Sequence, residues 1–302
     1  MTKDLSDLLL SPSWRAGKAY TPNDEARLRG EIARKLEGNT LEIALAAFPF
    51  KVPNPLKTQG IGPDWGERMA LERLARLSSE AQELGYELRW RIITDGAYYA
   101  QELSVAARDV KDYQDGVRDL AAVLGVPARF IELDSLVAKK PFAAKALDFA
   151  SDEHRPYVLR AGGMMNTHAY TDRLSGHFAA ENQVNAAIAR LLSENEQART
   201  QAERAAGLYQ ALKLEAEIEQ VFARFPEAVR ASIQPDASRA LHGRSVERPL
   251  SIRIVESKGQ NLFPWLGVPC KNGVIVVHYR AEALAQGFSP AIRDSLVVYC
   301  KP

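Results

Sequence analysis

The sequence predicts an α/β protein with a Rossmann-like, parallel-core sheet in its N-terminal half, followed by long helices and a mixed, β-rich C-terminal part. The first observation is that apolar strand-like runs alternate with helical stretches up to about residue 150. The second is that a long helical stretch and then several short apolar runs follow. We expect a single α/β unit over residues 1–302, with a Rossmann-like half at about 23–150 and a helical and β half at about 151–302.

In the N-terminal half, Asn23 is expected to cap a helix that ends at Gly38. Apolar residues at helical spacing predict a second helix from Asp64 to Leu84, and a third is expected at about 110–124. Three apolar runs predict strands, at Leu41–Phe48, Leu88–Thr94 and Arg129–Leu133. This β-α-β-α-β order is typical of a parallel sheet.

The C-terminal half is expected to begin as nearly continuous helix from about Ala179 to Phe225, with one apolar stripe that indicates core packing rather than a cofactor site. Four apolar runs after Pro226 predict strands, at Ala228–Ile233, Leu250–Val255, Val274–Tyr279 and Ser295–Tyr299. Alternation places Leu250, Ile252 and Ile254 on one side of their strand, with Ser251 and Arg253 on the other.

The composition argues against several classes of partner. With 39 basic and 38 acidic side chains, the formal net charge is +1, so no overall field attracts nucleic acid or an anionic membrane. No run approaches the ~20 apolar residues of a membrane span, and the N-terminal apolar run is too short for a signal sequence. The two cysteines, Cys270 and Cys300, are expected to be buried free thiols. We therefore expect a cytoplasmic protein.

Motifs for common cofactors are missing from the sequence. It contains no phosphate-binding G-x-x-x-x-G-K-[ST], no G-x-G-x-x-G after a strand, no H-E-x-x-H and no C-x-x-C. Its five histidines have no metal-ligand spacing. We expect neither a metal nor another cofactor.

Two polar segments follow predicted strands, where parallel sheets bind their ligands. The proline-rich segment Phe48–Lys57 follows the first strand and carries Lys51 and Lys57, and Asp95-Gly96 follows the second. Lysines on a rigid segment suit a local anion site, although a solvated loop is the alternative. Asp95-Gly96 can equally be a tight turn.

The segment Phe48-Pro-Phe-Lys-Val-Pro-Asn-Pro-Leu-Lys57, followed by Pro63-Asp-Trp-Gly-Glu67, resembles the F-P-x-K-x-P-N-x-x-K … P-D-x-G-E signature of the pyoverdine/dityrosine biosynthesis family, the isonitrile synthases. Further elements agree in order and spacing, from Asp95-Gly96 through Phe225-Pro226 and Val229–Ile233 to Pro264-Trp265. The resemblance extends over most of the chain, from about Phe48 to Arg280.

The resemblance implies that the α-amine of an amino acid condenses with the C2 ketone of ribulose 5-phosphate, in secondary metabolism. Such chemistry requires anion clamps, for which Arg and Lys are suited. The clamp candidates are Lys51, Lys57, Arg230 and Arg253, with Ser232 and Trp265 as further substrate-binding candidates. Arg253 can instead face water from an edge strand, and Trp265 can serve packing or form a wall for an aromatic substrate.

The same chemistry requires a general base for the ammonium group and a general acid for departing oxygens. Asp95, Asp64 and Glu67 are the candidates by position. Asp64 has an equally weighted alternative role as helix N-cap, with Glu67 completing a capping box. An iron(II)/2-oxoglutarate oxygenase of the same pathway is a possible partner that would act on the product.

Two positions depart from the family pattern, because Gln234 and Leu266 stand where the family usually has histidine. They motivate an alternative enzymatic function, another C–N condensation or lyase reaction on a sugar phosphate. A non-catalytic Rossmann-like binding module is a further alternative. The sequence leaves the amino acid substrate open.

Overall fold

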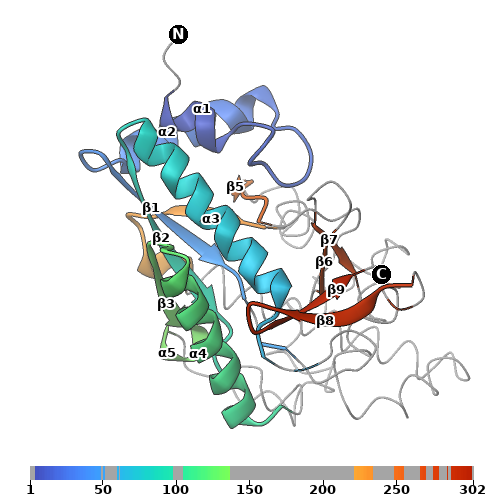
Figure 1. The fold of residues 1–302 in the computed structure, drawn as a ribbon. Helices are drawn as coiled ribbons and strands as arrows, with labels where there is room; N and C mark the ends of the chain where they lie inside the picture. Colours follow the sequence, from blue (N-terminus) through green and yellow to red (C-terminus); the bar gives the residue numbers. More distant parts are fainter. Residues whose placement is uncertain are drawn as a thin grey trace, which may run out of the picture.

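A computed structural model describes residues 4–48, 50–51, 60, 62–97, 105–136, 221–233, 248–254, 266–269, 275–278, 284 and 287–300. Its centre is a five-stranded sheet in the order β3-β2-β1-β4-β5, with every neighbouring pair parallel (Figure 1). The strands are β1 (Thr40–Ala46), β2 (Glu87–Thr94), β3 (Ala128–Glu132), β4 (Val229–Ser232) and β5 (Leu250–Ser251). The prediction of an α/β fold with a parallel core is confirmed.

The strand order reverses beside β1. The chain adds β2 and β3 on one side of β1, and later places β4 and β5 on its other side. In such sheets the crevice outside the carboxyl ends of the strands, at the point of reversal, is the usual ligand site. The residues that follow β1 and β4 therefore lie where a substrate is expected.

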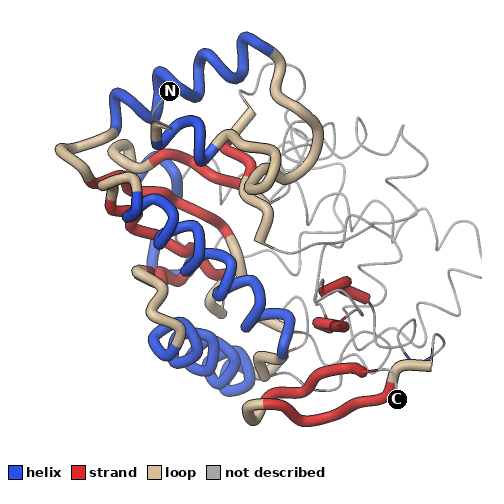
Figure 2. The backbone as a smooth tube through the Cα atoms, turned by 45° about the horizontal axis from the view of Figure 1, so that its top comes forward, coloured by secondary structure: helices blue, strands red, loops and turns tan. Residues whose placement is uncertain are grey.

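In the described part of the chain, three longer helices accompany the sheet, α2 (Pro22–Lys35), α3 (Trp65–Glu83) and α4 (Ala107–Val123). Helices α3 and α4 lie side by side (Figures 1 and 2). The cap expected at Asn23 is wrong, because Thr21 Oγ1 accepts from the backbone N–H of Asp24 and Pro22 occupies the first helical turn. Proline suits that position because its missing N–H would have no helical partner.

The core lies between the sheet and these helices. Alternate residues of β1, Leu41, Ile43 and Leu45, are fully buried, as are Leu71 and Leu77 of α3. Burying one such side chain contributes about 1.5–3 kcal/mol. This packing holds the amino end of α3 and the carboxyl ends of β1 and β2 in a fixed relation.

The N-terminal segment before α2 is attached to the far edge of the sheet. It contains α1 (Leu5–Leu9), whose leucines join the core. Guanidinium groups from distant elements donate to its backbone carbonyls. Arg73 bonds Ser13, Arg253 bonds Arg15, and Arg248 bonds Lys18 and Ala19. The backbone N–H of Arg253 also donates to the carbonyl of Trp14 at 2.8 Å, so the segment is bonded to the backbone just after β5 as well.

Among the described residues of the C-terminal part there are two antiparallel pairs of strands. Strand β6 (Leu266–Pro269) pairs with β7 (Ile275–His278), and β8 (Ser289–Arg293) pairs with β9 (Leu296–Cys300). Strand β6 contacts α3 and β9, so this part packs beside the main sheet. Strands β7 and β9 were predicted, whereas β6 and β8 were not. Each unpredicted strand contains a proline, which weakens a strand pattern.

Several expectations for the C-terminal half lie outside the described residues, including most of the long helix, Cys270 and Gln234. At the start of the described range 221–233, Phe222–Arg224 form a short 3₁₀ helix (η2) rather than a continuing α-helix. A four-residue helix, α5 (Leu133–Leu136), follows β3 directly. Cys300 is a free thiol that is partly rather than fully buried.

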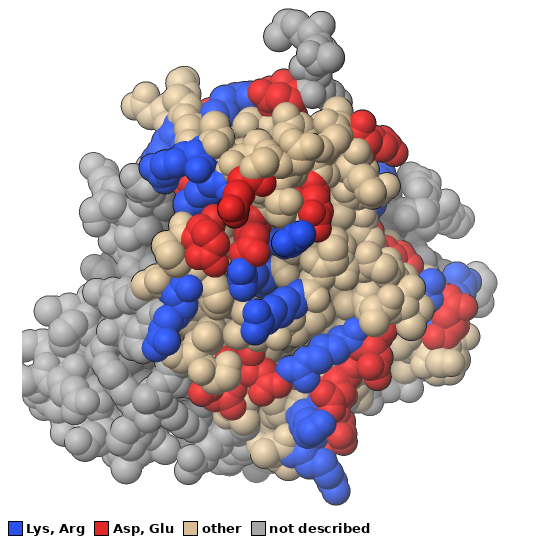
Figure 3. All heavy atoms as spheres, turned by 90° about the vertical axis from the view of Figure 1, so that its left-hand side faces the viewer, with Lys and Arg blue, Asp and Glu red and all other residues tan. Residues whose placement is uncertain are grey.

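The surface charges are mixed. Figure 3 shows basic and acidic side chains interleaved on one face of the molecule, and among the described residues there neither sign dominates. Within the described part of the chain, no helix combines the length and apolarity that crossing a bilayer would require.

Candidate active site at the carboxyl edge of the sheet

The chain turns sharply where it leaves β1. Phe48 adopts a left-handed backbone conformation with φ 56, which is unusual for a bulky residue. The side chains of Phe48 and Phe50 are buried, and the Phe48 ring lies 6.4 Å from that of Phe130. These apolar anchors fix the backbone so that the next residue, Lys51, points into the protein toward the beginning of α3.

Lys51 is the centre of a buried charge cluster. Its Nζ lies 2.9 Å from Asp64 Oδ2 and 2.8 Å from Glu67 Oε2, and it donates to the carbonyl of Gly62 at 3.1 Å. An ammonium group has three donor hydrogens, so these three acceptors use all of them. The residue is only 2% exposed. A phosphate could therefore bind Lys51 only by displacing a protein acceptor, and its assignment as a substrate clamp stays a prediction.

The first turn of α3 supplies both carboxylates. Asp64 is its N-cap and accepts from the backbone N–H of Gly66 at 2.7 Å, while Glu67 Oε2 accepts from the backbone N–H of Asp64 at 2.8 Å. This is the capping box that the sequence suggested as an alternative to catalysis. The two readings are compatible, because the capping bonds also hold both carboxyl groups beside Lys51.

Tyr113 of α4 completes the cluster. Its hydroxyl donates to Glu67 Oε1 at 3.1 Å, and Lys51 Nζ lies 6.0 Å from the centre of its ring. In the sequence, the spacing of Tyr113 within α4 marks it only as core-facing. No signal in the sequence connects it with Glu67.

The electrostatics of the cluster follow from its burial. Desolvation raises the pKa of Asp64 to about 7; Lys51 opposes this shift and the negative charge of Glu67 adds to it. Desolvation opposes the charge on Lys51, but the carboxylates outweigh it and its pKa is raised. Burial and the neighbouring carboxylates raise the pKa of the Tyr113 phenol well above its usual value. The tyrosine therefore remains a hydrogen-bond donor, and Asp64 can exchange a proton near neutral pH.

Asp95 follows β2 at the same edge and is 6% exposed. Its negative charge contributes to the raised pKa of Tyr113, which places it near the cluster. The next residue, Gly96, has φ 57, so a turn is present as well. Asp134 accepts from the backbone N–H of Ala97 at 3.2 Å and so anchors this turn to α5.

Gln114, next to Tyr113 on α4, also holds the turn after β2. With its amide oriented to match its neighbours, its oxygen accepts from the N–H of Gly96 at 2.9 Å and its nitrogen donates to Glu132 at 3.1 Å. No pattern in the sequence marks Gln114 for this role. One helix thus positions both the Asp95 turn and the carboxylates of α3.

The remaining predicted residues are distributed differently. Arg230 stacks on Phe222 at 4.8 Å, and Ser232 pairs with Ser251 at the carboxyl end of β4. The Nε of Arg253 donates to the carbonyl of Arg15 at 3.2 Å, so this guanidinium also holds the N-terminal segment. Lys57 and Trp265 lie outside the described residues. The structure thus gathers Lys51, Asp64, Glu67 and Asp95, and leaves the other assignments as predictions.

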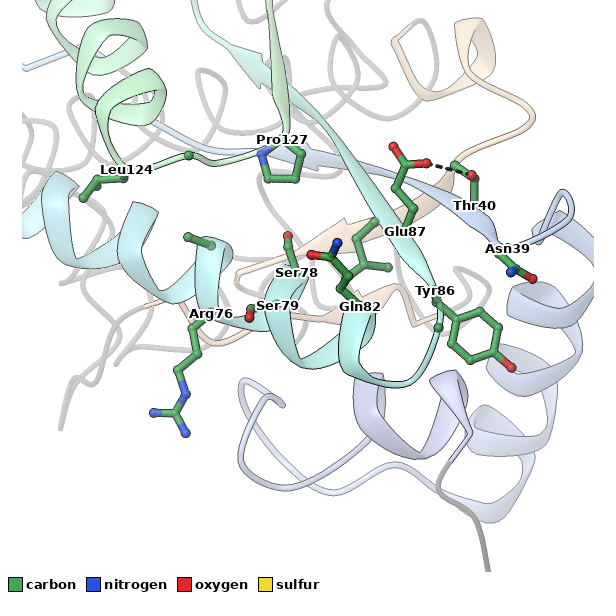
Figure 4. Close-up of a pocket in the computed structure, with 14 residues that line it drawn as sticks. Asn39, Thr40, Arg76, Ser78, Ser79, Gln82, Tyr86, Glu87, Leu124 and Pro127 are labelled. Atoms are coloured by element: carbon green, nitrogen blue, oxygen red, sulfur yellow. Dashed lines mark hydrogen bonds between the residues drawn. The ribbon is translucent and has the colours of Figure 1, made fainter.

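A cavity of about 810 Å³ lies at the opposite, amino edge of the sheet (Figure 4). Hydroxyl and amide side chains from the end of α3, including Ser78 and Gln82, line it together with Tyr86 and Pro127. The hydroxyl of Ser78 accepts a hydrogen bond from the indole N–H of Trp90, and Glu87 accepts one from the hydroxyl of Thr40. Because this cavity has no buried charge cluster, we place the candidate active site at the carboxyl edge instead.

Metal ligation receives no support within the described ranges, where no group of three or more His, Cys, Asp or Glu side chains is placed to hold an ion. The cluster as described offers acid–base chemistry. A charged lysine holds two carboxyl groups, one of which titrates near neutrality, at the edge of the sheet where substrates are expected to bind.

Comparison with known proteins gives this site a context. Residues 33–287 match the family described as pyoverdine/dityrosine biosynthesis protein. The chain belongs to this family. The resemblance seen in the proline-rich motif is therefore confirmed, and the candidate site lies within the matched residues.

Relatives within the family are named as synthases. The chain is 28% identical over 120 residues to the L-tryptophan isonitrile synthase of Fischerella ambigua, covering 39% of this chain and 36% of the relative. It is 28% identical to isocyanide synthase A of Aspergillus fumigatus, covering 44% of this chain and 22% of the relative. These two matches thus span well under half of the relatives' length. A longer match, 26% identical, covers 80% of this chain and 71% of the L-tyrosine isonitrile synthase of Xenorhabdus nematophila.

The fold is shared with a solved structure of the family. The PvcA protein from Pseudomonas aeruginosa superposes with a TM-score of 0.66 at 21% identity, covering 99% of this chain and 100% of that one. At this identity the comparison establishes the fold only.

Proposed function

We propose that this protein is an isonitrile synthase that condenses the α-amine of an amino acid with ribulose 5-phosphate. The match to the pyoverdine/dityrosine biosynthesis family over residues 33–287 carries the proposal. The relatives include tryptophan and tyrosine isonitrile synthases, which supports an isonitrile-forming reaction on an amino acid. The buried acid–base cluster at the carboxyl edge supplies the chemistry that such a reaction needs.

The first step requires proton transfer in both directions. The amine must lose a proton before its nitrogen attacks the C2 ketone, and the new N–C2 bond is followed by cleavage of C2–O, whose oxygen leaves as water. Asp95 is our candidate base for the ammonium group, because it lies at the end of β2 beside the cluster. Asp64, with a pKa of about 7, is our candidate acid for the departing oxygen.

We assign substrate binding to basic residues other than Lys51. The ammonium of Lys51 is engaged by Gly62, Asp64 and Glu67, so Lys57 and Arg230 become the stronger candidates for the phosphate and the carboxylate. Ser232 follows Arg230 on β4 at the point where the strand order reverses, which favours a role in contacting substrate.

The test is product analysis by mass spectrometry. The protein is incubated with ribulose 5-phosphate labelled with ¹³C at C2 and with tryptophan, tyrosine or a panel of other amino acids. We expect the label to appear as the isonitrile carbon of one amino acid derivative, with or without EDTA. Absence of a labelled product with every amino acid would refute the proposal. Activity that is lost on chelation and restored by one divalent ion would refute the expectation that the reaction needs no metal.

A second candidate is another C–N condensation or lyase reaction on a sugar phosphate. It is favoured by Leu266, which begins β6 at a position where the family usually has histidine. A chain that lacks this polar side chain can retain the condensation and lose a later step. The same experiment separates the two candidates. If the second candidate is right, the ¹³C label will be found in a product that has no isonitrile group.

A further inference from the structure

One side chain binds the residues on both sides of Asp95. Gln114 of α4 is 3% exposed, and with its amide oriented to match its neighbours its oxygen accepts from the N–H of Gly96 at 2.9 Å. The same oxygen accepts from the hydroxyl of Thr94 at 3.3 Å. Thr94 and Gly96 are the residues immediately before and after Asp95. A single amide oxygen therefore holds the chain on both sides of the candidate base.

The orientation of this amide is fixed from its other end. Its nitrogen donates to Glu132 Oε1 at 3.1 Å, and that oxygen also accepts from the guanidinium of Arg118. Because the Glu132 oxygen acts as an acceptor, the amide nitrogen must face it and the amide oxygen must face Gly96. Glutamine supplies a donor and an acceptor on one group, which an ionised glutamate or a methionine cannot do.

Further contacts leave the turn after β2 little freedom. The N–H of Ala97 donates to Asp134 at 3.2 Å, and a Cβ added at Gly96 would lie 2.2 Å from Asp134 Oδ1. The chain is thus held in place after Asp95 by two successive N–H groups. Gln114 provides the contact that spans both sides of this residue.

Helix α4 relates this turn to the cluster at the beginning of α3. Gln114 is adjacent in sequence to Tyr113, whose hydroxyl donates to Glu67 Oε1 at 3.1 Å. A Cβ added at Gly116 would lie 2.9 Å from Pro63 Cγ, so the glycine allows α4 to come this close to the segment that leads into α3. One helix thus contacts both the beginning of α3 and the turn that carries the candidate base.

We propose that Gln114 is a positioning residue, which sets the place of the Asp95 carboxylate relative to the carboxyl groups of Asp64 and Glu67. This inference rests on the proposed function. Gln114 itself does not touch the reacting atoms. It acts through the residues on either side of Asp95, and displacing a catalytic group by about 1 Å can lower a rate by about 10²-fold.

The test compares Gln114→Met with Ser78→Ala. Methionine keeps the length of the side chain and removes its hydrogen bonds to the turn. Ser78 is a matched control, because it also joins a helix to β2, through a hydrogen bond from the indole N–H of Trp90 at 2.9 Å. It lines the cavity at the opposite edge of the sheet. We expect both variants to be less stable than the parent in urea titrations.

Only Gln114→Met should lower turnover. We expect kcat to fall by about 10–100-fold while KM for ribulose 5-phosphate stays close to that of the parent. In an Asp95→Asn background the same substitution should lower kcat no further, because the group that Gln114 positions is already inactive. A kcat close to that of the parent, or an equal fold loss with and without Asp95→Asn, would overturn the inference.

A pair of substitutions tests whether the amide itself is responsible. Gln114→Glu keeps an oxygen for the N–H of Gly96 but places a second carboxylate against Glu132, so kcat should fall. Adding Glu132→Gln exchanges the donor and the acceptor of this contact and should restore most of the lost turnover. A double variant that is as stable as the parent but recovers no turnover would overturn the inference.

A last readout does not depend on the proposed function. Hydrogen exchange at the N–H of Gly96, followed by NMR, should be about 10-fold faster in Gln114→Met than in the parent and unchanged in Ser78→Ala. Equal exchange in Gln114→Met and the parent would show that Gln114 does not hold the turn. If the parent makes no isonitrile, the proposed function fails. The hold of Gln114 on the residues around Asp95 then stands or falls on these exchange rates.

Discussion

The ammonium of Lys51 lies 2.8 Å from Glu67 Oε2, and both side chains are almost completely removed from solvent. Removing one member of a buried ion cluster leaves the others uncompensated, which typically costs about 3–5 kcal/mol. We therefore expect Lys51→Met, which keeps the apolar stem, to lower the free energy of unfolding by about this amount in urea titrations. Lys111→Met is the control, because Lys111 pairs with Asp115 at the surface with 73% of its side chain exposed. Equal losses in the two variants would contradict the buried cluster.

Phosphosugar binding should depend on Lys57. Removing a charge-assisted contact costs about 1.5–3 kcal/mol, so Lys57→Ala should weaken the binding of ribulose 5-phosphate by that amount in calorimetry. Lys111→Ala serves as the control for the general loss of a positive charge. Unchanged affinity in Lys57→Ala would remove this residue from the phosphate site.

Asp95 is expected to act as a general base. Asp95→Asn should lower turnover by ~10²–10⁴-fold while leaving ribulose 5-phosphate affinity nearly intact. Asparagine forms the same hydrogen bonds in a turn, so a purely structural role would be preserved. The exposed Asp119 of α4 provides a control for the substitution itself, as Asp119→Asn. Steady-state kinetics within a few-fold of the parent would eliminate the catalytic role.

Asp64 should make stability depend on pH. Its pKa is raised from 3.8 to about 7, so the folded state binds its proton more tightly than the unfolded state does. The stabilisation is therefore fully present below the unfolded pKa and is lost as pH rises through the folded value.

Asp64→Asn removes this titration and keeps the N-cap, because asparagine caps helices about as well as aspartate. The unfolding free energy of the parent minus that of Asp64→Asn should fall between about pH 4 and about pH 7. Denaturant titrations at several pH values measure the difference. A difference that stays constant over this interval would show that Asp64 does not exchange its proton there.

Gly96 should tolerate no side chain. Its φ is +57, and an added Cβ would lie 2.2 Å from Asp134 Oδ1 and 3.0 Å from Glu132 Cβ. Gly38 has a similar φ of +58 but open space around it, so Gly38→Ala reports the backbone strain alone. That strain is about 1–2 kcal/mol, and crowding should add about 1–3 kcal/mol in Gly96→Ala. Similar unfolding free energies for the two variants would show that Asp134 moves aside freely.

The sequence predicted the sheet well because parallel strands are apolar on both faces and helices repeat their apolar residues every three or four positions. It also located the carboxyl edge, where Lys51 and Asp95 both lie. It could not predict which side chains meet there. Lys51 and Glu67 come from different elements, and the left-handed turn at Phe48, which directs Lys51 inward, has no glycine to mark it. The role of Tyr113 depends on the packing of α4 against α3, which no local pattern encodes.

The arginine contacts to the N-terminal segment bear on where a truncated form of this protein can begin. The family match begins at residue 33, within α2. A version cut at that residue would divide this helix and remove the carbonyl acceptors of Arg248 and Arg253. It would also uncover the apolar surface against which Leu5 and Trp14 pack. The cooperative folding unit therefore extends upstream of the residues matched to the family, and expression boundaries should follow the folding unit.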